Sequence, residues 1–507
     1  MGRWFDGYNR ERPHQALGYA TPAEVYFDPG AYGPVVAKAP ATTAPPGHPK
    51  TNYLYVVGLT GVAAIGGLLF GFDSGVVNGT VAALAAAFGT KAAATGFAVA
   101  SVLVGCAFGA FGAGALANRI GRRPTMIIDA VLFLGSAFVT GAAGSVGVFI
   151  GSRIVAGLAI GAASVLAPMY IAEVAPAHLR GRLASLQQLA IVLGLFFAFL
   201  SNDIIAKLSG RAAVTFWLGA SAWRWMFWVE ALSSAAFLLG TLLIPESPRY
   251  LVISGKQEQA RKIFARIGGS GKELVAQVEK SIAGAHRPRL SDLIVPGTRR
   301  IVPVVWVGVG LAALQQFVGI NIIFYFGEVL WRAAGATERL ALNINLLTAV
   351  INILATIPAI MLIDRVGRKP LLLFGSIGMA LALGVVAIVF ATAGVGPDGK
   401  PLLGRESAVT GLVAANLFIV AFAVSWGPVM WVLLGEMFPN RLRAAGLAVS
   451  GATNWIANFA VTVTFLPLMK HVGLAWTYGL YTVAAVASVL FVCTAVRETK
   501  GKPLEEM

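Results

Sequence analysis

Residues 315–325 carry the sequence Gln-Gln-Phe-Val-Gly-Ile-Asn-Ile-Ile-Phe-Tyr inside a long apolar run that begins at Ile301. Polar side chains are costly in membrane hydrocarbon, so they normally face a cavity or another helix. An ideal helix places Gln315, Asn321 and Tyr325 within an arc of roughly 120° and leaves Gln316 outside it. Gly319 can bend or break that helix. The stretch fits a hydrogen-bonding wall for a polyhydroxylated ligand and equally fits contacts between helices.

The composition is that of a membrane protein. Hydrophobic residues make up 57% of the 507 residues, charged residues make up 12%, and the mean hydropathy is +0.75. A membrane span needs about 20 predominantly apolar residues. The sequence contains twelve such runs, at approximately 53–77, 94–116, 124–143, 147–170, 183–204, 222–244, 301–325, 341–363, 370–392, 408–434, 444–470 and 473–496. We therefore predict an all-α membrane protein with twelve transmembrane helices.

The positive charge follows the membrane topology. With the N-terminus inside, the inner loops carry 24 of the 39 Lys and Arg residues and the outer loops carry 9. This asymmetry is the positive-inside rule, so the net charge of +16 sets orientation and indicates no nucleic-acid partner. Cys106 and Cys493 lie in apolar runs near opposite chain ends, so we expect neither a disulfide nor a metal site, and no cofactor.

The body of the chain is duplicated. Arg-Ile-Gly-Arg-Arg-Pro at 119–124 recurs as Arg-Val-Gly-Arg-Lys-Pro at 365–370, and Glu-x-x-Pro-x-x-Leu-Arg occurs at 173–180 and at 436–443. Each motif recurs six spans later on the same side of the membrane. Two parallel six-span halves are typical of a rocking transporter. The predicted divisions are an extension at 1–50, halves at 51–244 and 301–497, a cytoplasmic helical linker at 245–300 and a cytoplasmic tail at 498–507.

The linker contains apolar residues at helical spacing, at 260–267 and at 274–282, separated by Lys and Arg. This pattern predicts short amphipathic helices on the inner surface. They fit binding to acidic lipid headgroups and also packing under the helix bundle.

The first fifty residues differ from the rest. Residues 34–50 are predicted to be disordered because they are rich in Pro, Gly and polar residues. Tyr-Asn-Arg at 8–10, Arg-Pro-His-Gln-Ala-Leu-Gly-Tyr at 12–19 and Thr-Pro at 21–22 resemble the C-terminal tail of insertion-sequence transposases. The resemblance covers residues 4–26 and none of that enzyme's catalytic core. We interpret it as a fusion scar or as an upstream start codon in a neighbouring mobile element.

Several motifs in the body resemble the sugar porter family of the major facilitator superfamily, and within it the bacterial xylose–proton symporters. The resemblance covers about 55–502. Its motifs are Gly-Gly-Leu-Leu-Phe-Gly-Phe-Asp at 66–73, the two Arg-x-Gly-Arg motifs, Pro-Glu-Ser-Pro-Arg-Tyr-Leu at 245–251, Gln-Gln-Phe-Val-Gly-Ile-Asn at 315–321, Trp-Gly-Pro-Val-Met-Trp at 426–431 and Glu-Thr-Lys-Gly at 498–501. It implies a major facilitator fold.

The resemblance also implies a central sugar site. Ten residues match family positions that contact sugar: Phe70, Gln188, Gln315, Gln316, Asn321, Tyr325, Asn352, Gly427, Trp431 and Asn454. Amides donate and accept, so they suit hydroxyl groups, and Trp431 suits stacking on a pyranose or, alternatively, simple packing. Asn454 stands where the xylose symporters have a glutamine, and an asparagine at this position is similar to the animal glucose transporters. The resemblance therefore does not decide between a pentose and a hexose.

Three ionisable residues lie within spans at the same depth. Asp73 is near the outer end of the first span, and Arg153 and Glu230 are near the outer starts of the fourth and sixth. An aspartate beside an arginine stabilises both charges in a low-dielectric site. The resemblance implies that these three residues couple sugar to protons; the alternative is a structural ion pair.

Two further features of the spans carry predictions. Asp129 lies near the inner end of the third span, which favours a packing or headgroup-facing role. Gly157 and Gly161, one turn below Arg153, predict a close helix approach.

The duplicated motifs suggest a gating network at the inner face. We expect ion pairs that latch the halves when the outer side is open, with breakage accompanying the change of access. The candidate residues are Arg119, Arg122, Glu173, Arg180, Arg182, Arg365, Arg368, Glu436 and Arg443. Because single surface pairs contribute little, only a network would bias the two states.

The predicted function is import of a hexose or pentose by proton symport with alternating access. Its partners are the sugar, a proton and the lipid bilayer. The alternative is an uncoupled facilitator of the same fold. Known sugar sensors of this family carry long cytosolic tails, whereas this sequence ends a few residues after Glu498, so a sensor is disfavoured. The sequence contains no recognisable nucleophile–base pair, so we do not expect an enzyme. We expect a monomer in the plasma (inner) membrane with both termini in the cytoplasm.

Overall fold

The computed structural model describes residues 52–176, 180–283, 290–295, 298, 300–395, 401–439 and 442–500. Within these residues, twelve segments are helical, long and apolar enough to cross a membrane. They overlap the twelve predicted runs one for one, so the prediction of an all-α membrane protein is confirmed. The predicted disorder of 34–50 and the transposase-like stretch lie outside the described part.

The first group of helices runs from α3 to α9. Its members are α3 (Tyr53–Asn78), α4 (Val81–Phe88), α5 (Ala92–Ile120), α6 (Arg122–Ala142), α7 (Val146–Val174), α8 (Arg180–Ser209) and α9 (Ala222–Leu243), with a short 3-10 turn η2 (Trp217–Gly219). The short helices that follow are α10 (Pro248–Ile253), α11 (Gln257–Ile267), α12 (Gly271–Ala283) and the 3-10 turn η3 (Leu290–Leu293).

The second group runs from α13 to α20. Its helices are α13 (Pro303–Phe317), α14 (Ile320–Ala333), α15 (Glu338–Val366), α16 (Arg368–Ala391), α17 (Arg405–Val424), α18 (Trp426–Met437), α19 (Arg443–His471) and α20 (Gly473–Ala495). The strands β1 (Gly394–Val395) and β2 (Pro401–Leu402) pair antiparallel, with Gly394 opposite Leu402. Two spans are each built from two helices, namely α13 with α14 and α17 with α18.

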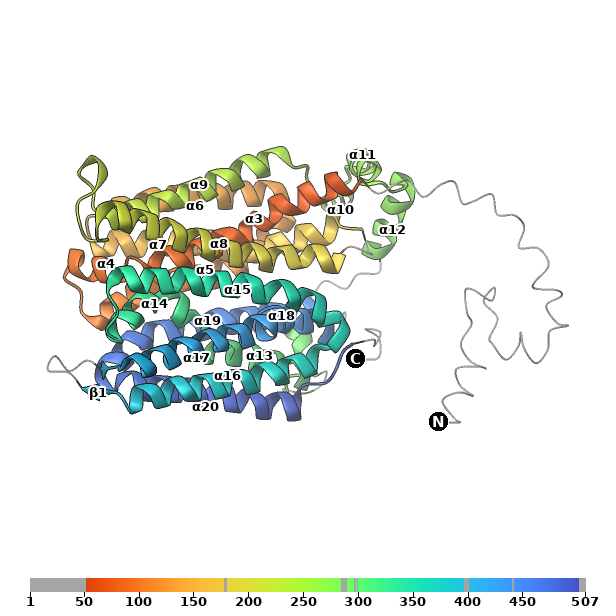
Figure 1. The fold of residues 1–507 in the computed structure, drawn as a ribbon. Coiled ribbons are helices and arrows are strands. Elements are labelled where there is room, and N and C mark those ends of the chain that lie inside the picture. The colour runs from red at the N-terminus through yellow and green to blue at the C-terminus, as the bar shows by residue number, and fades with distance from the viewer. Residues whose placement is uncertain are drawn as a thin grey trace, which may run out of the picture.

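The two groups of helices lie side by side as two halves (Figure 1). Helices α10 to α12 lie at one end of the bundle, here called the linker end, and the β1–β2 hairpin lies at the opposite end, here called the hairpin end. The halves meet where α5 packs on α19, α8 on α15 and α3 on α14. The polar residues Ser74 and Asn78 of α3 lie at this junction, because both contact α14.

Glycines let α5 and α7 approach closely, as predicted for Gly157 and Gly161. A Cβ atom added to Gly157 would lie 1.9 Å from the carbonyl oxygen of Val102, and one added to Gly161 would lie 2.1 Å from that of Cys106. No side chain fits at either position, because real Cβ contacts do not fall below 3.0 Å. Backbone contact of this kind is the usual basis of tight packing between membrane helices.

The amphipathic linker helices pack on one another. Leu251, Val252, Ala260, Phe264 and Val275 form a separate apolar cluster, and the N–H of Asn52 donates to the carbonyl of Ile267 at 3.0 Å. The cluster fixes α10, α11 and α12 as one layer beside the start of α3. These helices therefore pack chiefly on one another, and Ile267 at the end of α11 joins the main core of the bundle.

Candidate functional site

A helix break at Gly319 shapes the centre of the second half. α13 ends at Phe317, α14 begins at Ile320, and Gly319 between them has a φ of +79°. This left-handed conformation favours glycine, and a Cβ atom there would also lie 2.7 Å from the ring of Tyr481. The break that the sequence allowed at Gly319 is therefore present, and it brings Gln316 next to Asn321, which an ideal helix would not do.

Four of the predicted sugar-site residues form one hydrogen-bonded amide cluster: Gln315, Gln316, Asn321 and Asn454. Asn321 Nδ2 donates to Gln316 Oε1 at 2.7 Å, and Gln316 Nε2 donates to Asn454 Oδ1 at 3.2 Å. Asn454 Nδ2 donates to Gln315 Oε1 at 2.8 Å. Gln315 Nε2 in turn donates to the carbonyl oxygen of Trp426 at 2.9 Å.

The amide cluster joins four elements of the second half. Gln315 and Gln316 lie on α13, Asn321 lies on α14, Asn454 lies on α19, and the Trp426 carbonyl belongs to the first residue of α18. The bonds therefore act as contacts between helices, one of the two roles that the sequence left open. The same amides suit hydroxyl groups, since each can exchange an amide partner for a hydroxyl without losing a hydrogen bond.

Tyr325 belongs to a different neighbourhood from the amide cluster. Its hydroxyl lies 3.4 Å from Ser74 Oγ on α3. Phe70 on α3 packs edge-on against Trp455 on α19, with ring centroids 5.4 Å apart. Both aromatic residues therefore contribute contacts between the halves.

The remaining predicted sugar-site residues are not joined to the amide cluster by hydrogen bonds in the described part of the chain. Asn352 is buried on α15, Gln188 is half-buried on α8, and Gly427 lies in the first turn of α18. Trp431 is 41% exposed, so its ring is not a fully packed core aromatic.

Asp73 and Arg153 form a buried bidentate ion pair between α3 and α7. Arg153 Nη2 donates to Asp73 Oδ2 at 2.8 Å, and Nη1 donates to Oδ1. Each side chain is 1% exposed. The guanidinium also lies over the ring of Phe227, 5.8 Å from its centroid. The predicted pairing of these two residues is thus present.

Glu230 on α9 completes this group. It is buried near both Asp73 and Arg153, and its Oε1 atom has no hydrogen-bond partner among the described residues. Two carboxyl groups close together in a buried site resist being ionised at the same time. Asp73 and Glu230 thus lie near one guanidinium, and only Asp73 is bonded to it.

The linker end contains the same bidentate ion pair twice. Arg122 Nη2 lies 2.9 Å from Glu173 Oε1, and Arg368 Nη2 lies 2.7 Å from Glu436 Oε1. The Nε atoms of both arginines donate to the second carboxylate oxygen at 3.0 Å. Each pair joins two helices of one half. In the described part of the chain, the ion pairs at this end do not join the two halves.

Glu246 and Glu498 extend this duplicated unit, and the candidate residues chosen from the sequence did not include them. Glu246 accepts from the backbone N–H of Arg122 at 3.0 Å, and Glu498 accepts from that of Arg368 at 3.0 Å. Each carboxylate caps the start of a helix, α6 or α16, where free N–H groups favour negative charge. The recurrence of Glu-Ser at 246–247 as Glu-Thr at 498–499 was the signal that could have found them.

The hydroxyl groups next to these carboxylates complete the symmetry. Ser247 Oγ donates to Glu173 Oε2 at 2.5 Å, and Thr499 Oγ1 donates to Glu436 Oε2 at 2.6 Å. Burial opposes ionisation of Glu498, but the backbone N–H groups of Lys500, Arg368, Lys369 and Thr499 outweigh it and lower its pKa below the ordinary value. The helix cap of α16 is therefore a charged one.

Other predicted gating residues are placed differently. The carbonyl of Arg119 accepts from the Tyr250 hydroxyl at 3.2 Å, and that of Arg365 accepts from Lys500 Nζ at 2.5 Å. Arg443 Nε and Nη2 are buried without hydrogen-bond partners among the described residues. The side chains of Arg180 and Arg182 lie outside the described part of the chain. Asp129 is buried on α6, which favours packing over contact with headgroups.

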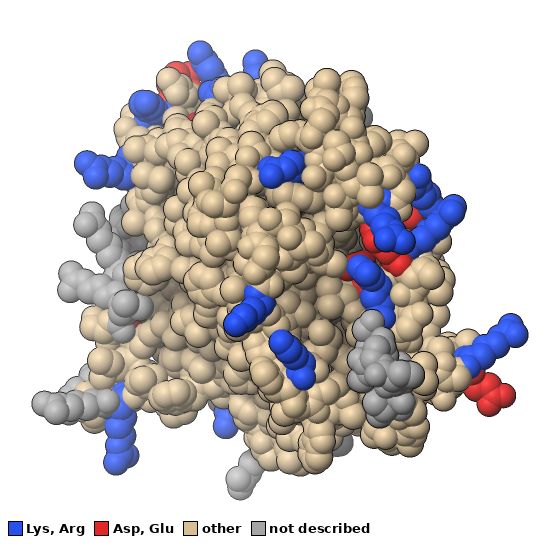
Figure 2. Space-filling model, turned by 90° about the vertical axis from the view of Figure 1, so that its left-hand side faces the viewer, with Lys and Arg blue, Asp and Glu red and all other residues tan. Residues whose placement is uncertain are grey.

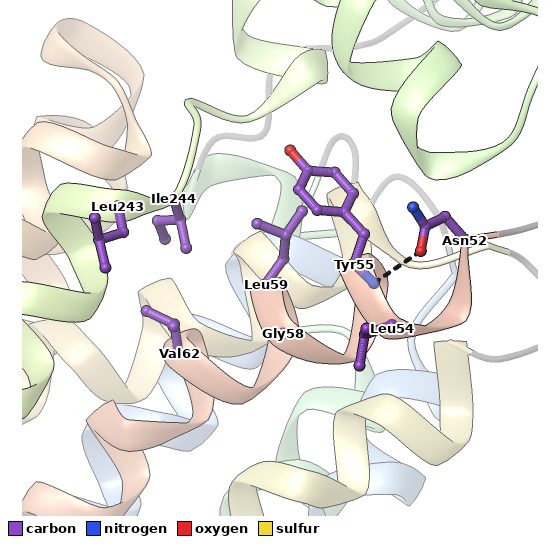
Figure 3. Close-up of a pocket in the computed structure, with 8 residues that line it drawn as sticks. All are labelled: Asn52, Leu54, Tyr55, Gly58, Leu59, Val62, Leu243 and Ile244. Carbon is purple, nitrogen blue, oxygen red and sulfur yellow. Dashed lines mark hydrogen bonds between the residues drawn. The ribbon is translucent and has the colours of Figure 1, made fainter.

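A groove of about 500 Å³ lies at the linker end of α3 and α9 (Figure 3). It is lined by Asn52, Leu54, Tyr55, Gly58, Leu59, Val62, Leu243 and Ile244. Asn52 Oδ1 accepts from the N–H of Tyr55 at 3.1 Å, so its polar group already caps α3. The groove is apolar and separate from both the amide cluster and the ion pair.

Comparison with known families identifies the fold family. The model of the family described as "Sugar (and other) transporter" matches residues 59–507. The chain belongs to this sugar transporter family. A second model, an integrase core domain, matches residues 1–22, in agreement with the transposase-like N-terminal sequence. The sugar transporter assignment therefore covers the whole helical body.

Two bacterial relatives of this sugar transporter align with it over almost their whole length. A glucose transport protein of Synechocystis sp. is 50% identical over 466 residues, which cover 91% of this chain and 99% of that protein. The D-xylose–proton symporter of Escherichia coli strain K12 is 38% identical over 491 residues, covering 90% and 96%. Both relatives are transporters.

Solved structures of the Escherichia coli xylose transporter share the fold. Its partially occluded inward-open conformation matches with a TM-score of 0.76 and 35% identity, covering 89% of this chain and 100% of that one. The same major facilitator superfamily protein bound to 6-bromo-6-deoxy-D-glucose matches with a TM-score of 0.73 and 37% identity, covering 90% and 98%. This sugar transporter thus has the major facilitator fold.

Proposed function

We propose that this sugar transporter imports a monosaccharide, a hexose or a pentose, together with a proton by alternating access. The observation that carries the proposal is the buried Asp73–Arg153 ion pair, with the carboxyl group of Glu230 buried close to it. Such a group takes up and releases a proton with a change in its ion pair. The relatives that transport glucose and symport xylose with protons support the same function.

The sugar site is centred on the amide cluster. When sugar binds, the amide cluster exchanges its internal hydrogen bonds for hydrogen bonds to sugar hydroxyls. The number of hydrogen bonds made by the amides therefore changes little. The exposed ring of Trp431 offers an apolar face for the pyranose. The rest of the site comprises Phe70, Gln188, Tyr325, Asn352 and Gly427.

Proton binding controls the Asp73–Arg153 pair. When Asp73 is ionised, its carboxylate holds both terminal nitrogens of Arg153. When Asp73 is protonated, the bidentate pair is lost and Arg153 is left with Glu230 as its acidic neighbour. The change alters contacts between α3, α7 and α9, next to the α3–α14 junction of the halves. Coupling follows if sugar binds best to one of these two protonation states.

The linker end faces the cytoplasm, and the chain resides in the plasma (inner) membrane. The excess of Lys and Arg in the loops of this end supports that orientation, since 24 lie there and 9 lie in the opposite loops. Figure 2 shows that the hairpin end is a largely uncharged surface with scattered Lys and Arg side chains. We assign both termini to the cytoplasm and propose that the protein acts as a monomer in the bilayer, without a nucleic-acid partner or an enzymatic activity.

The main alternative is a facilitator that moves sugar without a proton. The Synechocystis relative, which is more similar than the xylose symporter, is named only as a glucose transport protein. In a facilitator, the Asp73–Arg153 ion pair would have only the structural role of holding α3 against α7. A sugar sensor is a weaker alternative, with no specific contact that favours it.

Uptake by the purified protein in liposomes tests the proposal. Labelled glucose, xylose and fructose are supplied with and without an inward proton gradient, and sugar-driven proton entry is followed with a dye inside the vesicles. Proton-dependent accumulation above the external concentration of one sugar supports symport. Equilibration that does not depend on the gradient indicates a facilitator. Failure to take up any monosaccharide contradicts the sugar assignment.

A further inference from the structure

The segment between α8 and α9, residues 210–221 and here called the α8–α9 loop, folds back on itself at the hairpin end, beside the start of α9 (Figure 1). The N–H of Ala222 donates to the carbonyl oxygen of Val214 at 2.9 Å. Nearer the tip, the N–H of Phe216 donates to the carbonyl oxygen of Ala220 at 2.8 Å. Backbone hydrogen bonds therefore give this loop a fixed shape.

The outermost turn of the α8–α9 loop carries a leucine where such turns favour asparagine. The turn is closed by the N–H of Ala220, which donates to the carbonyl oxygen of Trp217 at 3.2 Å. Its central residues, Leu218 and Gly219, have φ of +54° and +73°. Two central residues with positive φ make a type I′ turn, whose first central position favours Asn, Asp or Gly. A left-handed conformation costs leucine stability, and packing within the protein does not offset this cost, because the side chain of Leu218 is 79% exposed.

Trp217 at the start of this turn is 62% exposed, and one face of its ring is held against α9. The ring stacks on that of Trp225, with centroids 5.0 Å apart, and Trp225 Nε1 donates to the carbonyl oxygen of Trp217 at 2.9 Å. Trp225 in turn packs edge-on against Trp228, whose Nε1 donates to the carbonyl oxygen of Phe138 on α6 at 3.1 Å. These contacts fix the position of Trp217 and Leu218, here called the tip, relative to α6 and α9.

The two tryptophans of α9 belong to the face of that helix that meets lipid. At 100° per residue, this face holds five side chains within an arc of about 60°, namely Trp225, Trp228, Leu232, Leu239 and Leu243. The three leucines are exposed on a helix that is long and apolar enough to span the membrane, so this face lies against hydrocarbon. The tryptophans stand at the hairpin end of the face, at the depth where tryptophan is enriched in membrane proteins. Because the tip stacks on Trp225, it continues the lipid-facing surface beyond the end of the helix.

We propose that the tip of the α8–α9 loop inserts Trp217 and Leu218 into the boundary between phospholipid headgroups and acyl chains, in the leaflet at the hairpin end. This interface suits the tip, because indole is amphipathic, leucine is apolar and residues 212–222 include no charged side chain. Arg211, exposed at the base of the loop, adds a cation for lipid phosphates. Burial of the leucine in lipid then offsets the unfavourable backbone of the turn. This membrane anchor goes beyond the proposed sugar transport and does not depend on it.

A nitroxide label beside the tip tests the anchor. Thr215→Cys, in a Cys493→Ser background, places the label at an exposed position two residues before Trp217, where extended chain points both side chains the same way. Phospholipid nanodiscs that hold one copy of the protein exclude a second copy as the partner. Oxygen is the lipid-soluble relaxing agent, and a nickel chelate is the water-soluble one. Arg339→Cys, exposed in the first turn of α15, reports a water-facing position at the same end.

We expect the oxygen-to-nickel collision ratio to be several times higher at position 215 than at position 339. Equal ratios at the two positions would overturn the anchor. Low access of both reagents to position 215 would indicate burial against protein, and it would overturn the assignment of lipid as the partner.

Leu218→Asn separates the anchor from the structure of the turn, because asparagine suits a type I′ turn and lacks the apolar side chain. We expect its thermal midpoint in detergent to be no lower than that of the wild type, and the collision ratio at position 215 to fall toward that at position 339. Leu218→Gly also suits the turn and should give the same fall, so it serves if the asparagine variant is unstable.

Leu340→Asn is the matched control, since Leu340 is an exposed leucine of α15 at the same end of the bundle. Its substitution should leave the collision ratio at position 215 unchanged. A wild-type ratio in both Leu218→Asn and Leu218→Gly, or an equal fall in Leu340→Asn, would overturn the anchor.

Discussion

Asp73 on α3 and Arg153 on α7 form a bidentate ion pair inside the helix bundle, and each side chain is 1% exposed. Glu230 on α9 is buried near this pair. The three side chains come from three helices of one half, so a change in their protonation acts directly on the packing of that half. This group gives the proposed proton coupling a physical basis that does not depend on which sugar is carried.

Arg153 should be essential for the stability of this buried group. Arg153→Met leaves Asp73 and Glu230 without a cation, and removal of one partner of a buried ion pair costs about 3–5 kcal/mol. We expect a large fall in the thermal midpoint of the detergent-purified protein at neutral pH. The double variant Arg153→Met with Asp73→Asn should recover part of that loss. Equal stability of Arg153→Met and the wild type would contradict the ion-pair assignment.

Loss of one member of the amide cluster should weaken sugar binding. Asn454→Ala removes partners of both Gln315 and Gln316, so we expect the sugar Kd to rise about tenfold or more, the effect of one or two hydrogen bonds in a buried site. Equilibrium binding of labelled sugar measures it. Asn416→Ala is the control, because Asn416 is a buried amide that bonds to Thr348, between α15 and α17. A similar loss of affinity in both variants would argue against a sugar role for the cluster.

The ion pairs at the linker end should bias the direction of opening. Each bidentate pair holds two helices of one half together at the linker end, so neutralising Glu173 and Glu436 loosens the packing of that end, and we expect the inward-open state to gain population. Labelling of cysteines introduced at the cytoplasmic mouth should become faster in Glu173→Gln with Glu436→Gln. Unchanged labelling would show that the two ion pairs stabilise only the helices that they join and do not affect opening at the linker end.

The charge of Glu498 should stabilise α16 in a pH-dependent way. Its pKa is lowered below the ordinary 4.5 of a glutamic acid, because backbone N–H donors outweigh burial. A carboxyl group whose pKa is lower in the folded protein than in the unfolded protein stabilises the fold at pH values above its unfolded pKa. This stabilisation is lost as the pH falls through its folded pKa. We expect Glu498→Gln to lower the thermal midpoint at pH 7 and to approach the wild type only as the pH falls through the lowered pKa of Glu498.

Glu406→Gln is the comparison for this experiment. Glu406 lies exposed in the first turn of α17, so its loss should change the midpoint little at either pH. A Glu498→Gln effect that persists unchanged at acidic pH would show that the hydrogen bonds, and not the charge, make the cap.

Close contact between α5 and α7 should not tolerate a side chain. Gly157→Val places atoms where the backbone of Val102 lies, so we expect loss of folded protein. Gly151→Val on the same helix has open space around its position and should express normally. Fluorescence size-exclusion profiles of both variants measure the outcome. A folded monodisperse Gly157→Val would contradict the packing of these two helices.

The features predicted well from the sequence are those set by local composition. Apolar runs located all twelve spans, and the spacing of Gly157 and Gly161 located a helix contact, because hydropathy and small residues act wherever the chain lies in a membrane. The pairing of Asp73 with Arg153 followed from their shared depth. These inferences needed no knowledge of how helices are turned about their axes.

Features that depend on helix rotation and on distant contacts were not predictable. The sequence allowed a helix break at Gly319, but it did not show that the break turns Gln316 toward Asn321. Asn78 on α3 donates to the carbonyl of Phe324 and accepts from the N–H of Glu328 on α14, about 250 residues away, and no local sequence pattern indicates this contact. Glu246 and Glu498 act on helix starts far along the chain, where a repeat of only two residues was easily overlooked.

The central claim is most directly tested by the substitution Asp73→Asn in proteoliposomes. Wild type and variant are compared for uptake driven by an inward proton gradient and for exchange of labelled against unlabelled sugar without a gradient. We predict that the variant loses accumulation above the external concentration and keeps exchange. Accumulation by the variant at the wild-type level would contradict coupling through Asp73, as would gradient-independent equilibration by both proteins.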